Sequence, residues 1–480
     1  MNTDIMTTLE NMENMVETSN GMGALGTTLN ECVNLFFQIG AMRGKSKKAL
    51  LHLFSKAYNE NPLVATKVLF WVRDVREGAG ERQIFKDILT YLAENNTDVV
   101  KKNLSLIPLF GRWDDVLVLV GTSLEDEVFE MIKTAIQNED ALCCKWLPRK
   151  GKVANAIRNY LKVSPKVYRK TIVNLTNVVE TAMCAKDYSN VDYSKLPSLA
   201  MSRYQRAFQT NDNERYAEYK EALKNGETKI NAGAVYPYDI TSTLGICGDN
   251  TIANEQWNSL PNWMEGSSER VLPVVDVSGS MGVPVGGNPN LTCMDVAISL
   301  GLYISERNEG NYKDAFITFS EDPQLQILDG SLEERFKQLS RADWGMSTNI
   351  EKVYSLILNQ AKENNIPQDM MPTKLLILSD MQFDAATNSR WGGGSKWNPT
   401  SQQMVEKMYE EYGYKLPEII YWNLNASMSN FPVEFNKVGT ALISGLNPSI
   451  LKSVLGGDEM TPEGIMMKTI DTERYNIISV

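Results

Sequence analysis

Histidine is almost absent from this sequence: His52 is the only one among 480 residues. There are six cysteines, and no two of them form a Cys-x-x-Cys pair: Cys32, Cys143, Cys144, Cys184, Cys247 and Cys293. Structural zinc sites draw on several His and Cys ligands, and Ser–His or Cys–His catalysis needs a positioned histidine. The composition therefore argues against zinc chemistry and against His-dependent hydrolysis.

Long hydrophobic runs are missing as well. No segment has the length needed to cross a bilayer, and residues 1–17 are acidic and lack the apolar core of a signal peptide. We therefore expect an intracellular, cytoplasmic protein without a membrane partner, in the host cytoplasm if the source is a virus.

Two glycine-containing stretches fall short of nucleotide motifs. Residues 40–46 (GAMRGKS) resemble a P-loop, but they are one residue too few and follow a segment with a helical pattern. Residues 78–80 (GAG) lack the third glycine and the preceding strand of a dinucleotide site. Neither stretch predicts nucleotide binding.

The chain is long enough for two or three domains, and 43% of its residues are hydrophobic. Helical spacing from residue 29 onward, without strand signals, predicts antiparallel helix pairs stacked as in HEAT-like repeats. Glycines and prolines gather in the segment that follows. The predicted order is a flexible N-terminus (1–25), a helical domain (26–225), a connecting segment (226–268), an α/β domain (269–456) and a C-terminal tail (457–480).

Strands and helices should alternate in the α/β domain and build a mostly parallel, doubly wound sheet. The predicted strands after the apolar run Val271–Val275 are Asp314–Ser320, Gln324–Leu328, Lys374–Asp380, Glu418–Asn423 and Thr440–Ser444. The predicted helices include Thr292–Glu306, Leu332–Leu339, Ile350–Ala361 and Ser401–Tyr412. The fold class is thus α plus α/β.

Oxygen-bearing side chains follow two of these strands. In the stretch Val271–Gly282 (VLPVVDVSGSMG), the apolar part is followed by Asp276, Ser278 and Ser280. A second apolar run ends in Asp380. Thr348 precedes an expected helix between them. Ligands bind beyond the carboxyl ends of parallel strands. Carboxylates and hydroxyls suit a hard cation, Mg²⁺ first and then Mn²⁺ or Ca²⁺. The alternative is a serine-rich turn without a ligand.

This Asp-x-Ser-x-Ser…Thr…Asp arrangement resembles the metal-ion-dependent adhesion site of von Willebrand factor A domains. The resemblance implies that Ser278, Ser280 and Thr348 contact the metal. It also implies that Asp276 and Asp380 hold the metal mainly through water. One coordination position would then accept water or a carboxylate of a ligand.

Positive charge is concentrated in residues 145–229. This segment has 17 Lys and Arg against 8 Asp and Glu, whereas the whole chain carries a formal charge of −11. Aromatic residues lie among these charges: Trp146, Tyr160, Tyr168, Tyr193, Tyr204, Phe208 and Tyr216. Basic groups bind phosphates, and rings stack on unpaired bases. The alternative is a solvated basic face over core aromatics.

Four segments resemble the helical part of TROVE-type proteins, the relatives of the Ro ribonucleoproteins: Phe70–Glu81, Ile107–Asp115, Lys145–Arg149 and Lys195–Arg206. The resemblance runs from about Gly21 to about Gly456 and is strongest to an uncharacterised branch that carries the same C-terminal A domain. In Ro proteins a ring of HEAT-like helices binds RNA, so RNA binding is implied here by that resemblance.

Three functions compete on this basis. The first is an RNA-binding scaffold for small structured or single-stranded RNA. Its candidate contacts are Lys166, Tyr168, Arg169, Lys170, Arg203 and Arg206. The second is a protein-interaction module whose metal captures an Asp or Glu carboxylate of a partner. A metal-dependent hydrolase is the weakest, because one metal without an evident base suits catalysis poorly. We expect the RNA-binding scaffold, with the protein-interaction module as the alternative, and therefore a binding protein that is not an enzyme.

Overall fold

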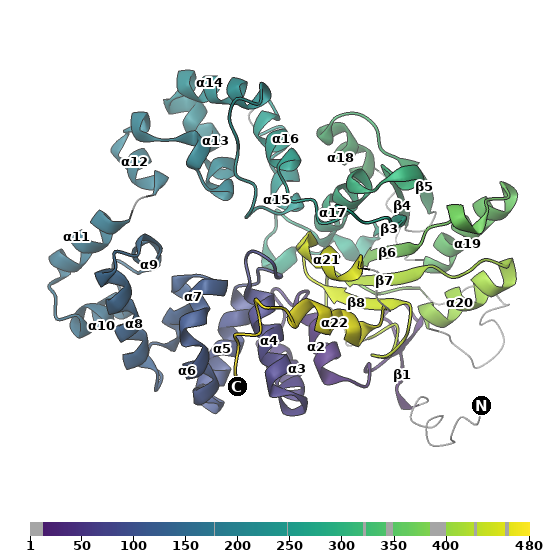
Figure 1. The fold of residues 1–480 in the computed structure, drawn as a ribbon, viewed down its shortest axis with the longest axis horizontal. Helices are drawn as coiled ribbons and strands as arrows, with labels where there is room; N and C mark the ends of the chain where they lie inside the picture. The colour runs from purple at the N-terminus through teal and green to yellow at the C-terminus, as the bar shows by residue number, and fades with distance from the viewer. Residues whose placement is uncertain are drawn as a thin grey trace. The chain divides into compact units, whose positions relative to one another are not determined.

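The computed structural model describes residues 13–176, 178–246, 248–319, 323–341, 349–384, 400–426, 430–456 and 460–480 (Figure 1). The chain divides into two compact units. We call the first the sheet unit; it contains Met1–Asn61, Tyr236–Ser242 and Asn262–Thr472. We call the second the helical unit; it contains Pro62–Val235, Thr243–Pro261 and Glu473–Val480.

The centre of the sheet unit is a six-stranded sheet in the order β5-β4-β3-β6-β7-β8. All neighbours run parallel except β4 and β5, which are antiparallel. The strands are β3 (Val271–Asp276), β4 (Ala315–Phe319), β5 (Gln324–Ile327), β6 (Lys374–Ser379), β7 (Glu418–Asn423) and β8 (Thr440–Ser444). The prediction of a mostly parallel sheet is therefore confirmed.

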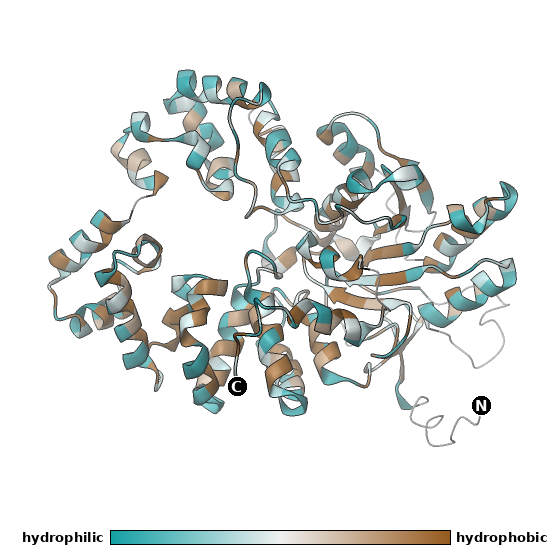
Figure 2. Cartoon of the chain, in the orientation of Figure 1, coloured by the Kyte–Doolittle hydropathy of each residue, from teal (hydrophilic) through white to brown (hydrophobic). Residues whose placement is uncertain are grey.

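Every residue of β3, β6 and β8 is buried, so both faces of the sheet are covered at these strands. This explains why the strands are continuous apolar runs rather than alternating ones. Figure 2 shows the same strands as the most hydrophobic part of the unit. The sheet unit also contains α15 (Pro237–Thr241), α17 (Cys293–Arg307), α18 (Leu332–Ser340), α19 (Ile350–Glu363), α20 (Ser401–Tyr412), α21 (Leu451–Val454) and α22 (Pro462–Ile470).

Helix α17 approaches β3 closely. A Cβ on Gly301 would lie 2.6 Å from the Val275 side chain, so glycine lets the helix reach the strand. The helix starts with a capping box, in which Thr292 and Asp295 satisfy each other's backbone N–H groups. These contacts fix the element that follows the polar loop after β3.

The first two helices, α2 (Glu31–Ile39) and α3 (Lys47–Glu60), also belong to the sheet unit. The sequence predicts them in the helical domain (26–225), and this boundary is wrong. The Ser444 hydroxyl, at the end of β8, donates to the Phe36 carbonyl (2.7 Å) and accepts from the Gly40 N–H (3.1 Å). Helix α2 thus packs on the sheet, and the helical unit starts only at Pro62.

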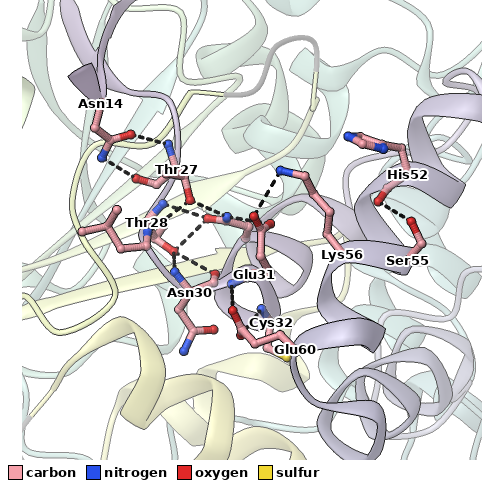
Figure 3. Close-up of polar contacts among 12 residues, drawn as sticks. Asn14, Thr27, Thr28, Asn30, Glu31, Cys32, His52, Ser55, Lys56 and Glu60 are labelled. Atoms are coloured by element: carbon pink, nitrogen blue, oxygen red, sulfur yellow. Dashed lines mark hydrogen bonds and ion pairs between the residues drawn. The ribbon is translucent and has the colours of Figure 1, made fainter. Parts of the chain in front are cut away.

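The predicted flexible N-terminus (1–25) contains two strands within its described residues. Strands β1 (Met15–Glu17) and β2 (Gly23–Leu25) form an antiparallel pair. The backbones of Leu25 and Phe431 exchange two hydrogen bonds of 2.8 Å. Asn14 bonds Thr27, and Glu60 accepts the first N–H groups of α2 (Figure 3). The side chain of His52 lies apart from this network (Figure 3).

Regular elements described in the helical unit are all helices, and most are short. The longer ones are α4 (Pro62–Arg73), α5 (Gln83–Asn95), α8 (Glu125–Gln137), α10 (Lys152–Tyr160), α11 (Pro165–Leu175), α13 (Ser198–Asn211), α14 (Asn213–Lys224) and α16 (Thr251–Asn258). The shorter α-helices are α6 (Thr97–Asn103), α7 (Ile107–Phe110), α9 (Ala141–Trp146) and α12 (Val179–Ala185). The combination of helices with an α/β sheet confirms the fold class, while HEAT-like repetition stays a prediction.

Aromatic rings build much of the core of the helical unit. Phe70 packs edge-on against Phe85 and Phe110, with ring centroids 5.5 and 5.4 Å away. Tyr475, from the predicted C-terminal tail, stacks on Phe110. The tail is therefore partly a core element. Among the described residues, no helix combines the length and apolarity that crossing a membrane requires.

Candidate metal centre

The candidate metal centre lies where two neighbouring parallel strands end. Strands β3 and β6 pair with Val275 opposite Leu378, which brings Asp276 and Asp380 to the same edge of the sheet. Asp276 is fully buried, and Asp380 is 3% exposed. The Ser379 hydroxyl donates to Asp276 Oδ2 (2.6 Å), and the Ser278 N–H donates to its Oδ1 (2.9 Å). Asp276 is therefore held in one orientation.

Two hydroxyls complete the described part of the centre. Ser278 Oγ and Ser280 Oγ lie 3.0 Å apart in the loop after β3. Ser278 is buried and Ser280 half-buried, so the loop opens outward at Ser280. Met381 has φ 63°, a left-handed conformation that turns the chain sharply after Asp380, and the Gln382 N–H donates to Asp380 Oδ1 (3.2 Å).

The electrostatics of the centre favour a cation. Burial, followed by the negative charge of Asp380, raises the pKa of Asp276 to about 7. Burial also raises the pKa of Asp380, opposed by the Gln382 N–H, the Ser280 hydroxyl and the charge of Lys45. Two buried carboxylates repel each other and lose hydration unless a positive charge compensates them. Carboxylate and hydroxyl oxygens are hard donors, so these residues fit Mg²⁺ or Mn²⁺.

Four of the five predicted metal ligands meet at this edge: Asp276, Ser278, Ser280 and Asp380. Thr348 lies outside the described residues. Lys45, whose charge opposes the upward shift of the Asp380 pKa, was not among the predicted site residues. It comes from the turn between α2 and α3, in the stretch dismissed as an incomplete P-loop. The sequence feature that could have identified Lys45 is the cluster of basic residues in that turn.

The candidate RNA contacts in the helical unit divide into exposed charges and a buried ring. Lys166, Arg169 and Lys170 are exposed on α11, and Arg203 and Arg206 are exposed on α13. Tyr168 is 3% exposed, and its hydroxyl donates to the Pro148 carbonyl (3.1 Å). The expectation that Tyr168 stacks on a base was wrong, because the ring belongs to the core.

Three of the other six aromatics named in the basic segment are also buried, and the remaining three are half-buried. Tyr193, Phe208 and Tyr216 belong to one buried cluster, with ring centroids 5.1 to 5.6 Å apart. The half-buried ring of Trp146 is covered by the guanidinium of Arg112, 3.6 Å from the ring centroid. For these rings the core interpretation holds, and the basic charge is left as the feature that reaches solvent.

Two family models match the chain. The domain of unknown function DUF7788 matches residues 270–476, and the domain of unknown function DUF2828 matches residues 18–143 and 145–268. The uncharacterized protein L728 of Acanthamoeba polyphaga mimivirus is 28% identical, over 98% of this chain and 89% of the viral protein.

Among solved structures, the crystal structure of the Deinococcus radiodurans Ro (RSR) protein matches with a TM-score of 0.37 and 13% identity. That match covers 90% of this chain and 93% of the bacterial one. The DUF2828 model spans more than half of the sequence. This chain is therefore a member of the DUF2828 family.

Proposed function

We propose that the sheet unit is a cation-dependent binding module of the von Willebrand factor A type. Ser278, Ser280, Asp276 and Asp380 would hold Mg²⁺ or Mn²⁺, with Thr348 as a further ligand. The cation would capture a carboxylate of a partner protein. The observation that carries this proposal is the pair of buried carboxylates beside two hydroxyls at the carboxyl edge of the sheet.

The chain's own residues prepare the centre. Ser379 and the Ser278 N–H keep both Asp276 oxygens engaged, so the carboxylate does not need to reorient when a ligand arrives. The bound cation would supply positive charge for an incoming anionic oxygen. We propose binding rather than catalysis, because hydrolysis on one cation needs a separate base and both carboxylates are committed to the cation.

Calorimetry with Mg²⁺ and Mn²⁺ tests this proposal. The double variant Asp276→Asn with Ser278→Ala should lose measurable binding, while Asp329→Asn, which removes an equal charge at an exposed turn, should bind as the wild type does. Unchanged cation affinity in the double variant would remove the proposal. Circular dichroism checks that both variants fold.

A second function, RNA binding by the helical unit, is favoured by the exposed charges on α11. Lys166, Arg169 and Lys170 lie within five residues, and no acidic side chain within the described chain pairs with Lys166 or Lys170. Tyr168, Tyr193 and Phe208 are internal. We therefore propose contacts to phosphates of structured RNA, joined by Arg203 and Arg206 of α13, rather than base stacking.

Charge reversal tests the RNA proposal. The variant Lys166→Glu, Arg169→Glu, Lys170→Glu should weaken binding of a structured RNA and flatten its dependence on salt, because fewer counterions are released. The matched control reverses Lys313, Lys407 and Lys415, which are exposed in the sheet unit. Equal losses in both variants would mean that only net charge matters and would overturn the assignment to α11.

A further inference from the structure

A pocket of ≈ 90 Å³ lies within the sheet unit at the turn between α2 and α3. Its lining combines two cations, an amide and apolar side chains: Arg43, Lys45, Asn425, Val283, Cys293 and Leu446. The Ala426 N–H donates to the Ala41 carbonyl (3.1 Å), which holds the loop after β7 against this turn. The pocket is thus built by segments far apart in the sequence.

The cationic wall of the pocket is fixed in place. Gly286 has φ 61°, and a Cβ on it would lie 2.5 Å from the Cγ and Cδ atoms of Arg43. The aliphatic part of the Arg43 side chain therefore packs directly over the glycine. The guanidinium charge of Arg43 acts to lower the pKa of Asp239. Lys45 is half-buried. Its charge acts to lower the pKa of two groups, Cys293, which lines the pocket, and Asp380 of the candidate metal centre.

The amide in the pocket has no hydrogen-bond partner among the residues that the structure describes. Asn425 is 8% exposed, and its backbone N–H donates to Asn423 Oδ1 (3.0 Å). Its side-chain amide makes no hydrogen bond within the described part of the chain. The amide lines the pocket, and its NH₂ group can donate up to two hydrogen bonds to an occupant. An occupant that accepts hydrogen bonds would satisfy it.

We propose that this pocket is a subsite for a second carboxylate of the ligand whose first carboxylate binds the cation. Lys45 would serve both positions, because its charge reaches the pocket and Asp380 alike. Asn425 and Arg43 would donate to the second carboxylate, and Val283 and Leu446 would contact its methylene groups. The partner is then a protein segment with two acidic side chains. This inference rests on the proposed cation site.

Small carboxylates test the subsite on the full-length, Mn²⁺-loaded protein. Calorimetry would compare acetate with malonate, succinate, glutarate and adipate, which place two carboxylates at increasing separations. We expect at least one dicarboxylate to bind roughly tenfold more tightly than acetate, as expected for one added charged hydrogen-bonded contact. In the Lys45→Gln variant, the dicarboxylate should bind no more tightly than acetate. Asn425→Asp should have the same effect, because it adds a negative charge to the pocket.

The control is Lys48→Gln, which removes an equal charge from the exposed first turn of α3, outside the pocket lining. It should keep the dicarboxylate advantage. Thermal unfolding of each variant checks that it folds, and Lys45→Gln suffices if Asn425→Asp does not fold.

The two proposals fail differently. If the wild type gives no Mn²⁺ binding heat, the cation site is absent and the subsite falls with it. If Mn²⁺ and acetate bind but no dicarboxylate gains affinity, or if the gain survives Lys45→Gln, only the subsite is wrong. Inorganic phosphate binding more tightly than every dicarboxylate would overturn the carboxylate assignment.

Discussion

Asp74 accepts hydrogen bonds from Nε and Nη2 of Arg474, although the two residues are 400 positions apart in the sequence. The Tyr475 hydroxyl donates to the same carboxylate (2.9 Å), which is fully buried. The hydrogen bond to Asp74 raises the pKa of Arg474 above its usual value, although burial opposes this shift. The end of the chain is therefore a structural part of the helical unit.

Arg474→Leu should destabilise the helical unit by about 3 kcal/mol, because it leaves a buried carboxylate without its ion-pair partner. Tyr475→Phe removes one hydrogen bond and should cost about 1 kcal/mol. Thermal unfolding followed by circular dichroism measures both. If Arg474→Leu unfolds at the wild-type temperature, the contact to Asp74 contributes no stability.

Gly111→Ala should destabilise the same unit through a steric clash. A Cβ there would lie 2.4 Å from Asp115 Oδ2 and 2.8 Å from Arg73 Nε, which form a buried ion pair. Displacing this pair should cost about 2 kcal/mol or more. Gly233→Ala is the matched control, because nothing lies within 4 Å of the added carbon. Denaturant titration should separate the two variants.

Mn²⁺ should raise the unfolding temperature of the sheet unit if the candidate metal centre binds it. At a hundredfold excess over the dissociation constant, linkage adds about 2.7 kcal/mol. Asp380→Asn should remove most of this shift, and EDTA should abolish it in the wild type. Differential scanning calorimetry with and without Mn²⁺ makes the measurement, and an equal shift in Asp380→Asn would contradict the site.

Asp239 should make stability depend on pH between about 4 and 6. Burial raises its pKa to about 6, opposed by the Tyr236 N–H and the charge of Arg43. Within this window the folded state keeps a proton that the unfolded state has released, so stability falls as pH rises and levels off above pH 6. Because Asp239 is only partly shielded from water, we expect the free energy of unfolding to decrease by about 1–2 kcal/mol across this pH window.

Asp239→Asn should remove this dependence. Its amide oxygen can still accept from the Tyr236 N–H, which donates to Asp239 Oδ2 over 2.9 Å, but it does not titrate. Urea titrations at pH 4.5 and pH 7 would compare the variant with the wild type. The same pH dependence in both proteins would show that Asp239 is not its source.

The central strands were predictable because they are short, apolar and buried on both faces, so burial alone fixes their pattern. The predicted bounds of β7 and β8 agree with the structure residue for residue, whereas β3 extends one residue past the predicted apolar run, to Asp276. Asp276 and Asp380 followed from the same rule, since parallel neighbours bring their ends together. Thr348 stays a prediction.

Features that depend on distant packing were not predictable. The apolar face of α2 gave no sign that it would pack against β8, about four hundred residues later. Lys45 likewise reaches Asp380 only through that packing. Tyr168 was misjudged although the sequence held the signal. It lies four residues before Ile172, on one helix face, and both are buried while the basic residues occupy the other faces.

The way the chain divides has a practical consequence for dissecting this protein. The polypeptide passes from one unit to the other after Asn61, Val235, Ser242, Pro261 and Thr472. A fragment cut at residues 269–456 would lose α2, α3, α15 and α22 from around its sheet. A fragment cut at residues 26–225 would lose Arg474 and Tyr475, which together donate three hydrogen bonds to the buried carboxylate of Asp74. Neither unit can be excised with a single cut, so each binding function is best separated by point substitution in the full-length chain.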